Sequence, residues 1–103
     1  MDYTYQAQDG QARIEITGRI DQQDINKLKE PFLRLEVDAV ERVELDFKNV
    51  SYIGSTGIAT LLQLHKRLAS RGGGLNLVNL SPDMANLFEA LKLDRIFGIG
   101  VRP

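Results

Sequence analysis

The sequence contains no cysteine, and this absence excludes disulfide bonds, thiolate metal sites and cysteine nucleophiles together. It contains a single histidine, His65, so a histidine-based metal site is not expected either. Only carboxylates remain as metal ligands, and along the sequence they form no tight cluster. We therefore predict a protein without a bound metal or cofactor.

The chain also lacks a strong charge of either sign and a long apolar run. A formal net charge of −1 gives no electrostatic reason to expect nucleic acid as a partner. Residues 1–10 are polar, unlike a secretory signal, and no apolar run approaches the roughly 20 residues that span a bilayer. We expect no membrane insertion and a cytoplasmic location. The 103 residues suit one domain over 1–103, and the oligomeric state is left open.

Two short segments near the N-terminus alternate between apolar and polar residues, over 3–7 and over 12–16. A period of two is typical of half-buried strands. Asp9-Gly10 lies between the segments, and this dipeptide readily adopts the positive φ angles of a tight hairpin turn. The pattern predicts an antiparallel hairpin.

A helical spacing replaces this alternation over 25–35, where apolar residues recur every three or four positions. Asp21 or Asp24 is a candidate cap for this helix. Pro31 lies inside the stripe and removes one helical hydrogen bond, so we expect a kink or a late helix start. A strand over 43–47 and then a polar turn are predicted to follow.

The second half of the chain alternates helices with strands. Ser55-Thr56-Gly57 opens the longest helical stripe, which ends at Arg71-Gly72-Gly73-Gly74. That glycine run lacks the ending of a phosphate-binding loop and follows a helix, so a helix end and turn are predicted. A buried strand over 75–80 precedes a helix that starts at Ser81-Pro82-Asp83. A short final strand is expected over 99–101.

The order of the expected elements is β-β-α-β-α-β-α-β. Strands that alternate with helices form a mostly parallel sheet. We therefore predict an α/β fold, with a mostly parallel sheet of four to five strands opened by the hairpin and helices packed on it. The parallel connections are expected to be right-handed.

Two adjacent hydroxyls, Ser55 and Thr56, stand at the turn before the longest helix. Sites in α/β sheets are usually built beyond the carboxyl ends of strands, so these hydroxyls are expected to be exposed. A phosphate there would add roughly 1.5 to 2 negative charges and repel a partner, while the helix start tolerates it. Serine and threonine are also preferred N-caps, so a purely capping role remains open.

Three motifs in the chain resemble the STAS domain family, of the anti-sigma factor antagonist type. Residues 50–58, VSYIGSTGI, resemble the family signature, in which a strand and a turn lead to two hydroxyl residues and glycine. Residues 18–21, GRID, resemble the family's Gly-x-Leu-Asp turn, and residues 91–97, LKLDRIF, resemble its closing stretch. The resemblance covers essentially the whole chain in the correct order.

The resemblance implies a regulatory binding protein and not an enzyme. Such proteins bind a GHKL-type serine kinase that is also an anti-sigma factor, and thereby free the sigma factor. The kinase phosphorylates the first signature hydroxyl, which blocks binding, and a phosphatase reverses the modification. Carried onto this chain, the acceptor is Ser55, with Thr56 as second choice, and Asp21 is the acid near the acceptor. The implied partner-binding residues are Asp21, Gly54, Ser55, Thr56 and Gly57.

The sequence departs from the family pattern at Gly54. Phosphorylated members usually have an aspartate immediately before the acceptor serine. The missing carboxylate affects either kinase recognition or the charge around the phosphate. Alternatively, glycine is present because it allows a turn geometry that other residues disfavour.

A second function is compatible with the same motifs, namely a constitutive STAS subunit of a larger assembly such as a lipid-transport ABC system. An enzyme is a distant third possibility, since no catalytic triad can be argued from sequence order. His65 lies in the helical stripe and is expected to be a satisfied, partly buried histidine. The acids Asp38, Glu41, Glu44 and Asp46 are expected to form a solvated edge.

Overall fold

A computed structural model describes residues 1–102 and contains one sheet of five strands with the order β1-β2-β3-β4-β5. The first pair of strands is antiparallel and the other pairs are parallel. The strands are β1 (Asp2–Gln8), β2 (Gln11–Ile20), β3 (Arg42–Ile53), β4 (Gly74–Leu80) and β5 (Gly98–Val101). The helices are α1 (Ile25–Val37), α2 (Ser55–Ala69) and α3 (Pro82–Ala90), with 3-10 turns η1 (Gln22–Asp24) and η2 (Leu93–Arg95). The predicted α/β fold is confirmed.

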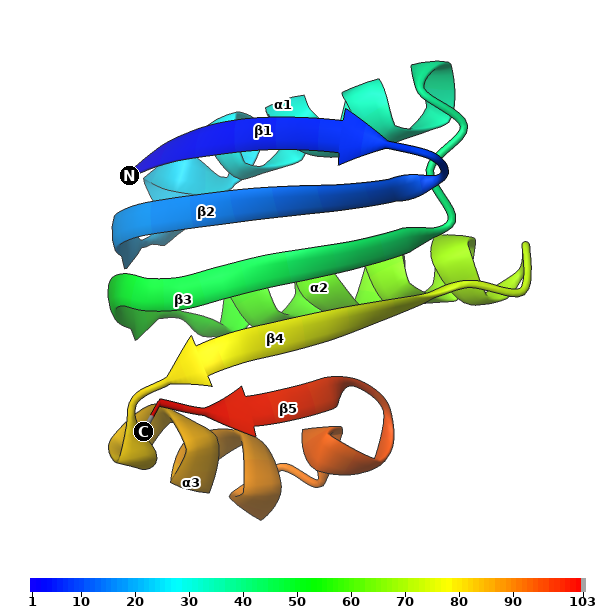
Figure 1. Ribbon diagram of the computed structural model, residues 1–103. Coiled ribbons are helices and arrows are strands. Elements are labelled where there is room, and N and C mark those ends of the chain that lie inside the picture. The colour runs from blue at the N-terminus through cyan, green and yellow to red at the C-terminus, as the bar shows by residue number, and fades with distance from the viewer. Residues whose placement is uncertain (103) are drawn as a thin grey trace.

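The chain forms two layers, with α1 and α2 behind the sheet and α3 beside β5 (Figure 1). Strand residues that face the helices are buried, and most of their neighbours on the other face are polar. The largest fully buried side chains include Ile14, Ile16, Leu45, Phe47, Leu77 and Phe88. One face of the sheet is therefore the core of the protein, and the other is open.

The hairpin between β1 and β2 turns at Asp9 and Gly10, as predicted. Their φ angles are 54° and 80°, and two successive positive φ angles suit the right-handed twist of the flanking strands. Gln8 pairs with Gln11 directly beside the turn. The first strands are thus set by local turn chemistry.

Helix α1 begins at Ile25 and continues through Pro31, so the predicted late start is wrong. Pro31 cannot donate a backbone hydrogen bond, but its side chain is buried against the core. Burial of apolar surface offsets the missing bond. The candidate cap Asp24 accepts a hydrogen bond from the N–H of Asp21 at 2.9 Å and so closes the turn before the helix.

Strand β3 runs to Ile53, so the polar turn expected after residue 47 is wrong. Two β-bulges explain the difference. Between Asp46 and Asn49, and again between Val50 and Tyr52, β3 holds one residue more than β2. In the first bulge the Asp46 carboxylate accepts the N–H of Lys48 at 2.9 Å. The polar residues therefore lie in an irregular strand.

The remaining boundaries agree with the sequence patterns. Gly72 has a φ of 81°, and the N–H of Gly73 donates to the carbonyl oxygen of Leu68, so the glycine run ends α2 and is no phosphate loop. The hydroxyl of Ser81 accepts the N–H of Met84 at 3.2 Å and caps α3. Within residues 1–102, no helix has the length and apolar character needed to cross a membrane.

Candidate functional site

Ser55 is the first residue of α2. It lies at the end of the sheet where the parallel strands β2 and β3 both terminate. The last residues of these strands, Ile20 and Ile53, are partners in the register. The N–H of Gly54 then donates to the carbonyl oxygen of Ile20 at 3.0 Å. Asp21 and Ser55 therefore follow the ends of neighbouring strands at the same end of the sheet, which we call the Ser55 edge. The resemblance to the STAS family predicts the site at this place.

The hydroxyls of Ser55 and Thr56 are exposed and do not cap the helix. The N-cap is Gly54, and the first backbone bond of α2 runs from the N–H of Ile58 to the carbonyl oxygen of Gly54 at 3.1 Å. Ser55 and Thr56 lie inside the helix start, so the capping role considered for them is wrong. Both hydroxyls can be modified without loss of a cap.

Gly54 has an ordinary extended backbone, with φ −87° and ψ 173°. A β-carbon built at this position would come no closer than 3.4 Å to another residue, and that contact is the hydroxyl of Tyr52. The turn does not require glycine, so the conformational explanation for Gly54 is wrong. The missing aspartate is a chemical difference, because its backbone would fit.

Gly57 is required by packing. It is buried, and a β-carbon there would lie 2.9 Å from Cγ1 of Ile53 and 3.0 Å from Cγ2 of Ile20. The helix therefore approaches the ends of β2 and β3 so closely that a side chain at this position would require Ile53 or Ile20 to shift. Gly57 holds the Ser55 end of α2 against the sheet.

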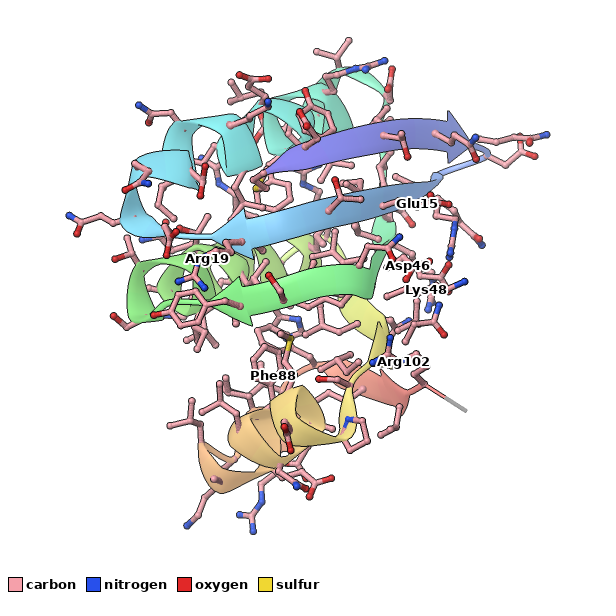
Figure 2. The ribbon with its side chains drawn as sticks, turned by 90° about the vertical axis from the view of Figure 1, so that its left-hand side faces the viewer. Glu15, Arg19, Asp46, Lys48, Phe88 and Arg102 are labelled. Atoms are coloured by element: carbon pink, nitrogen blue, oxygen red, sulfur yellow. The ribbon has the colours of Figure 1, made fainter. Side chains whose placement is uncertain are left out.

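Arg19 and Tyr52 flank the Ser55 edge, and sequence reasoning missed both. The guanidinium carbon of Arg19 lies 4.4 Å from the centroid of the Tyr52 ring. Arg19 also contacts the Asp21 carboxylate, at 3.3 Å from Nε and 3.4 Å from the terminal nitrogen. Figure 2 shows Arg19 at the carboxyl end of β2, away from Glu15 and Asp46. The pairing of Arg19 with Tyr52 depends on both bulges in β3, so no local pattern reveals it.

The amino-acid sequence matches the family model of the STAS domain over residues 3–103. The chain belongs to the STAS domain family. The STAS domain is 30% identical over 90 residues to the anti-sigma-B factor antagonist of Bacillus subtilis (strain 168), over 87% of this chain and 82% of the relative.

Two solved structures share the fold. The anti-sigma factor antagonist from Mycobacterium paratuberculosis is similar with a TM-score of 0.82 at 20% identity, over 96% of this chain and 84% of that one. The Bacillus cell fate determinant SpoIIAA in its phosphorylated form is similar with a TM-score of 0.75 at 19% identity, over 95% and 90%. None of the three relatives carries the name of an enzyme.

The open face of the STAS sheet carries a second polar cluster, centred on Arg13. Its guanidinium lies 2.5 Å from the Asp46 carboxylate, is paired with Glu44, and lies 3.5 Å from Glu15. Asp46 is buried and also accepts the side-chain amide of Asn79 at 3.1 Å. The expected solvated edge is therefore wrong for Asp46. No group of carboxylates or His65 in residues 1–102 is arranged to hold a metal ion.

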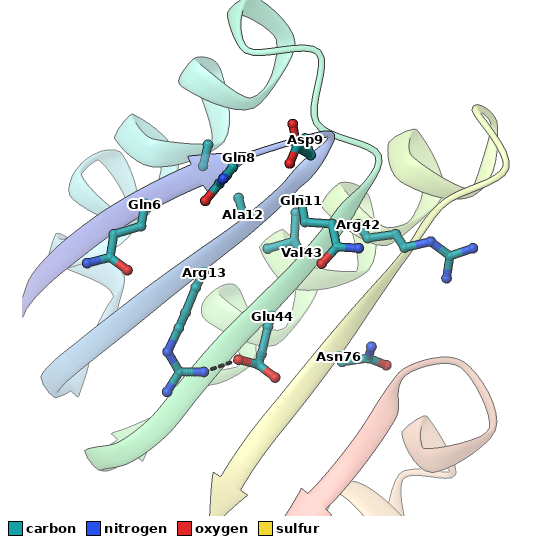
Figure 3. Close-up of a pocket in the computed structure, with 11 residues that line it drawn as sticks. Gln6, Gln8, Asp9, Gln11, Ala12, Arg13, Arg42, Val43, Glu44 and Asn76 are labelled. Carbon is teal, nitrogen blue, oxygen red and sulfur yellow. Dashed lines mark hydrogen bonds and ion pairs between the residues drawn. The ribbon is translucent and has the colours of Figure 1, made fainter.

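A hollow lies over the amino-terminal part of the same face, lined mainly by strand residues around Arg13 and Glu44. Figure 3 shows these two side chains bonded to each other across β2 and β3. Ser55 does not line this hollow, and Arg13 and Glu44 neutralise each other there. We assign no function to it.

His65 is partly buried, as predicted, but it is not satisfied. Its ring meets Phe97 edge-on at a centroid distance of 5.6 Å, and Nδ1 has no hydrogen-bond partner within residues 1–102. A histidine that acts as a general base is oriented by a partner on its second nitrogen. The geometry supports a packing role for His65.

Proposed function

We propose that this protein is an anti-sigma factor antagonist that works by binding a protein partner and is switched off by phosphorylation at Ser55. The partner is an anti-sigma factor that is also a serine kinase of the GHKL type, and a phosphatase restores binding. The observation that carries the proposal is the exposed, non-capping hydroxyl of Ser55 at the STAS signature. Residues 1–103 form one STAS domain, and it acts in the cytoplasm without catalysing a reaction.

The physical basis of the switch is local charge. In the unmodified protein, the edge formed by Asp21, Gly54, Ser55 and Thr56 meets the partner. A phosphate on Ser55 adds roughly 1.5 to 2 negative charges to that edge, and a partner surface fitted to a neutral hydroxyl is then repelled. The fold tolerates the modification because the hydroxyl is exposed. ATP belongs to the kinase, so this chain needs no cofactor.

Gly54 defines how this site differs from the family pattern. The backbone there accommodates other residues, so the absent aspartate lowers the negative charge next to the acceptor. Asp21, which directly follows the end of the neighbouring strand β2, is then an acid available at this site. We infer that kinase recognition at this site depends on Asp21 more than in relatives with an aspartate before the serine.

The names of the relatives favour this function over a constitutive subunit of a lipid-transport ABC system. The Bacillus subtilis relative and the Mycobacterium structure are both named as anti-sigma factor antagonists. The phosphorylated SpoIIAA structure supports a phosphate on this fold. An ABC subunit would use the same hydroxyl turn as a contact and would need no phosphate.

Intact mass spectrometry of protein purified from its native cells tests the switch. We expect a one-phosphate adduct in the wild type and in Thr56→Ala, which is the matched control, and none in Ser55→Ala. The same purification should yield a kinase-like partner with Ser55→Ala and lose it with Ser55→Asp. Absence of the adduct under every growth condition, together with co-purification of an ABC ATPase, would contradict the proposal.

A further inference from the structure

Arg19 lies at the Ser55 edge and is only loosely paired with Asp21. Its side chain is 60% exposed, and the 3.3 and 3.4 Å contacts with Asp21 are long for a charge-assisted hydrogen bond. Elsewhere Arg13 approaches Asp46 at 2.5 Å and also pairs with Glu44. The guanidinium of Arg19 is therefore held in place while most of its donors are free.

The ring of Tyr52 supports the guanidinium of Arg19. Its ring lies under the guanidinium at 4.4 Å, and arginine stacks favourably on aromatic faces. The same tyrosine borders the turn, because its hydroxyl is the nearest atom to a β-carbon built at Gly54. Tyr52 thus bridges Arg19 and the residue that precedes Ser55.

We propose that Arg19 binds the phosphate on Ser55 in the modified protein. The inference rests on the proposed function and adds the residue that receives the phosphate. A phosphate dianion is a stronger acceptor than the single carboxylate of Asp21, and the planar guanidinium matches it with two parallel N–H donors. Arg19 therefore exchanges Asp21 for the phosphate while its guanidinium stays stacked on Tyr52.

The residue at position 54 decides whether the movement of Arg19 from Asp21 to the phosphate is favourable. An aspartate there would compete for the guanidinium and would repel the phosphate. Glycine carries no carboxylate that could compete for Arg19, and the nearest side chain to a β-carbon built at Gly54 is that of Tyr52. The glycine at position 54, which departs from the family pattern, thus favours the binding of phosphate by Arg19.

The test uses full-length protein with phosphoserine incorporated at position 55 during translation, so no kinase is needed. The second pKa of the phosphate, ordinarily about 6, is measured by ³¹P NMR titration. Because an opposite charge favours the ionised form, Arg19→Gln should raise this pKa by about half a unit to one unit relative to the phosphorylated wild type. Arg19→Lys should fall between the two.

Arg42→Gln is the matched control, since Arg42 is exposed at the other end of β3, where its partner Gln11 lies roughly 26 Å along β2 from Arg19. Its phosphate pKa should equal that of the wild type. Equal pKa values in wild type and Arg19→Gln would overturn the assignment of Arg19. An equal rise of the phosphate pKa in Arg19→Gln and Arg42→Gln would also overturn it, because the overall charge of the protein would then explain the shift. Neither result touches the switch itself, which the mass measurement in native cells tests separately.

Discussion

Within residues 1–102 two arginine–tyrosine stacks are present, and they differ in how fully their polar groups are paired. Arg34 of α1 lies 4.1 Å from the ring centroid of Tyr5, whose hydroxyl donates to Asp38 at 2.7 Å. Arg19 lies 4.4 Å from the ring of Tyr52, and its contacts are longer than 3.2 Å. The first stack ties β1 to the end of α1, and the second stands beside the signature hydroxyl.

The difference distinguishes a region that stabilises the fold from the region at which we propose that phosphorylation acts. Polar groups away from the Ser55 edge, with Asp46 as the clearest case, are hydrogen-bonded to partners far along the chain. At the Ser55 edge the hydroxyls are exposed and the arginine is only loosely paired. One region holds the fold, and the other is free to change its charge.

Asp46→Ala should give the largest effect on stability. The change removes the acceptor of the Lys48 N–H and of the Asn79 amide, and one of the three carboxylates around Arg13, which costs about 2–3 kcal/mol of unfolding free energy. Urea denaturation measures the loss. Glu15→Ala, which removes an exposed partner of Arg13, should cost under about 0.5 kcal/mol. A cost for Ser55→Ala as large as for Asp46→Ala would break the comparison between the two regions.

A matched glycine pair sharpens the comparison within the Ser55 edge. Gly57→Ser should lower the unfolding free energy by about 1–3 kcal/mol, because its side chain would collide with Ile20 and Ile53. Gly54→Ser should leave stability unchanged or raise it slightly, since serine is a good N-cap and fits the backbone. Thermal unfolding measures the change in stability of each variant. A loss for Gly57→Ser alone would show that Gly57 has a packing role and that Gly54 does not. Equal losses in both variants would contradict the assignment.

The sequence predicted the elements whose causes are local and missed those that depend on register. The Asp9-Gly10 hairpin and the Ser81 cap follow from turn and cap chemistry within a few residues. The far half of β3 was missed because its bulges replace the period of two with a period of three. Asp46 was misjudged because Arg13 and Asn79 lie 33 residues away on either side in the chain.

The candidate site shows the same division. The resemblance picked out Ser55 and Asp21, which lie at adjoining strand ends. Arg19 lay inside a recognised motif, yet only the three-dimensional register brings it onto Tyr52. The backbone angles of Gly54 were likewise needed to show that the turn does not require glycine.

The Tyr5 stack predicts a dependence of stability on alkaline pH. Burial, followed by the hydrogen bond to Asp38, raises the pKa of Tyr5 to about 12. The unfolded chain titrates near 10, so the folded state retains this proton longer. The resulting stabilisation is complete below pH 10 and is lost as the pH rises from 10 to 12. Tyr5→Phe should reduce that pH dependence and remove the latest component of tyrosinate absorbance. A wild-type titration completed near pH 10 would contradict the prediction.

Ser55→Asp should give the smallest effect on the fold. An acid at the first residue of α2 interacts favourably with the helix N-terminus, so the unfolding free energy should change by less than about 0.5 kcal/mol. Circular dichroism during thermal unfolding, with Thr56→Asp as control, measures this. Unfolding of the Ser55→Asp protein would show that the hydroxyl is structural and would remove the contrast between the two regions.

The two bulges in β3 also make the strand tolerant of changes in length. Its inward-facing residues Phe47, Val50 and Ile53 are three apart, whereas their counterparts on β2 are two apart. Loss of one residue from either bulge, such as Lys48 or Ser51, would restore plain alternation and leave every inward side chain inward. Single-residue deletions in either bulge should therefore be tolerated by the fold. The Ser55 turn should keep its orientation in such variants.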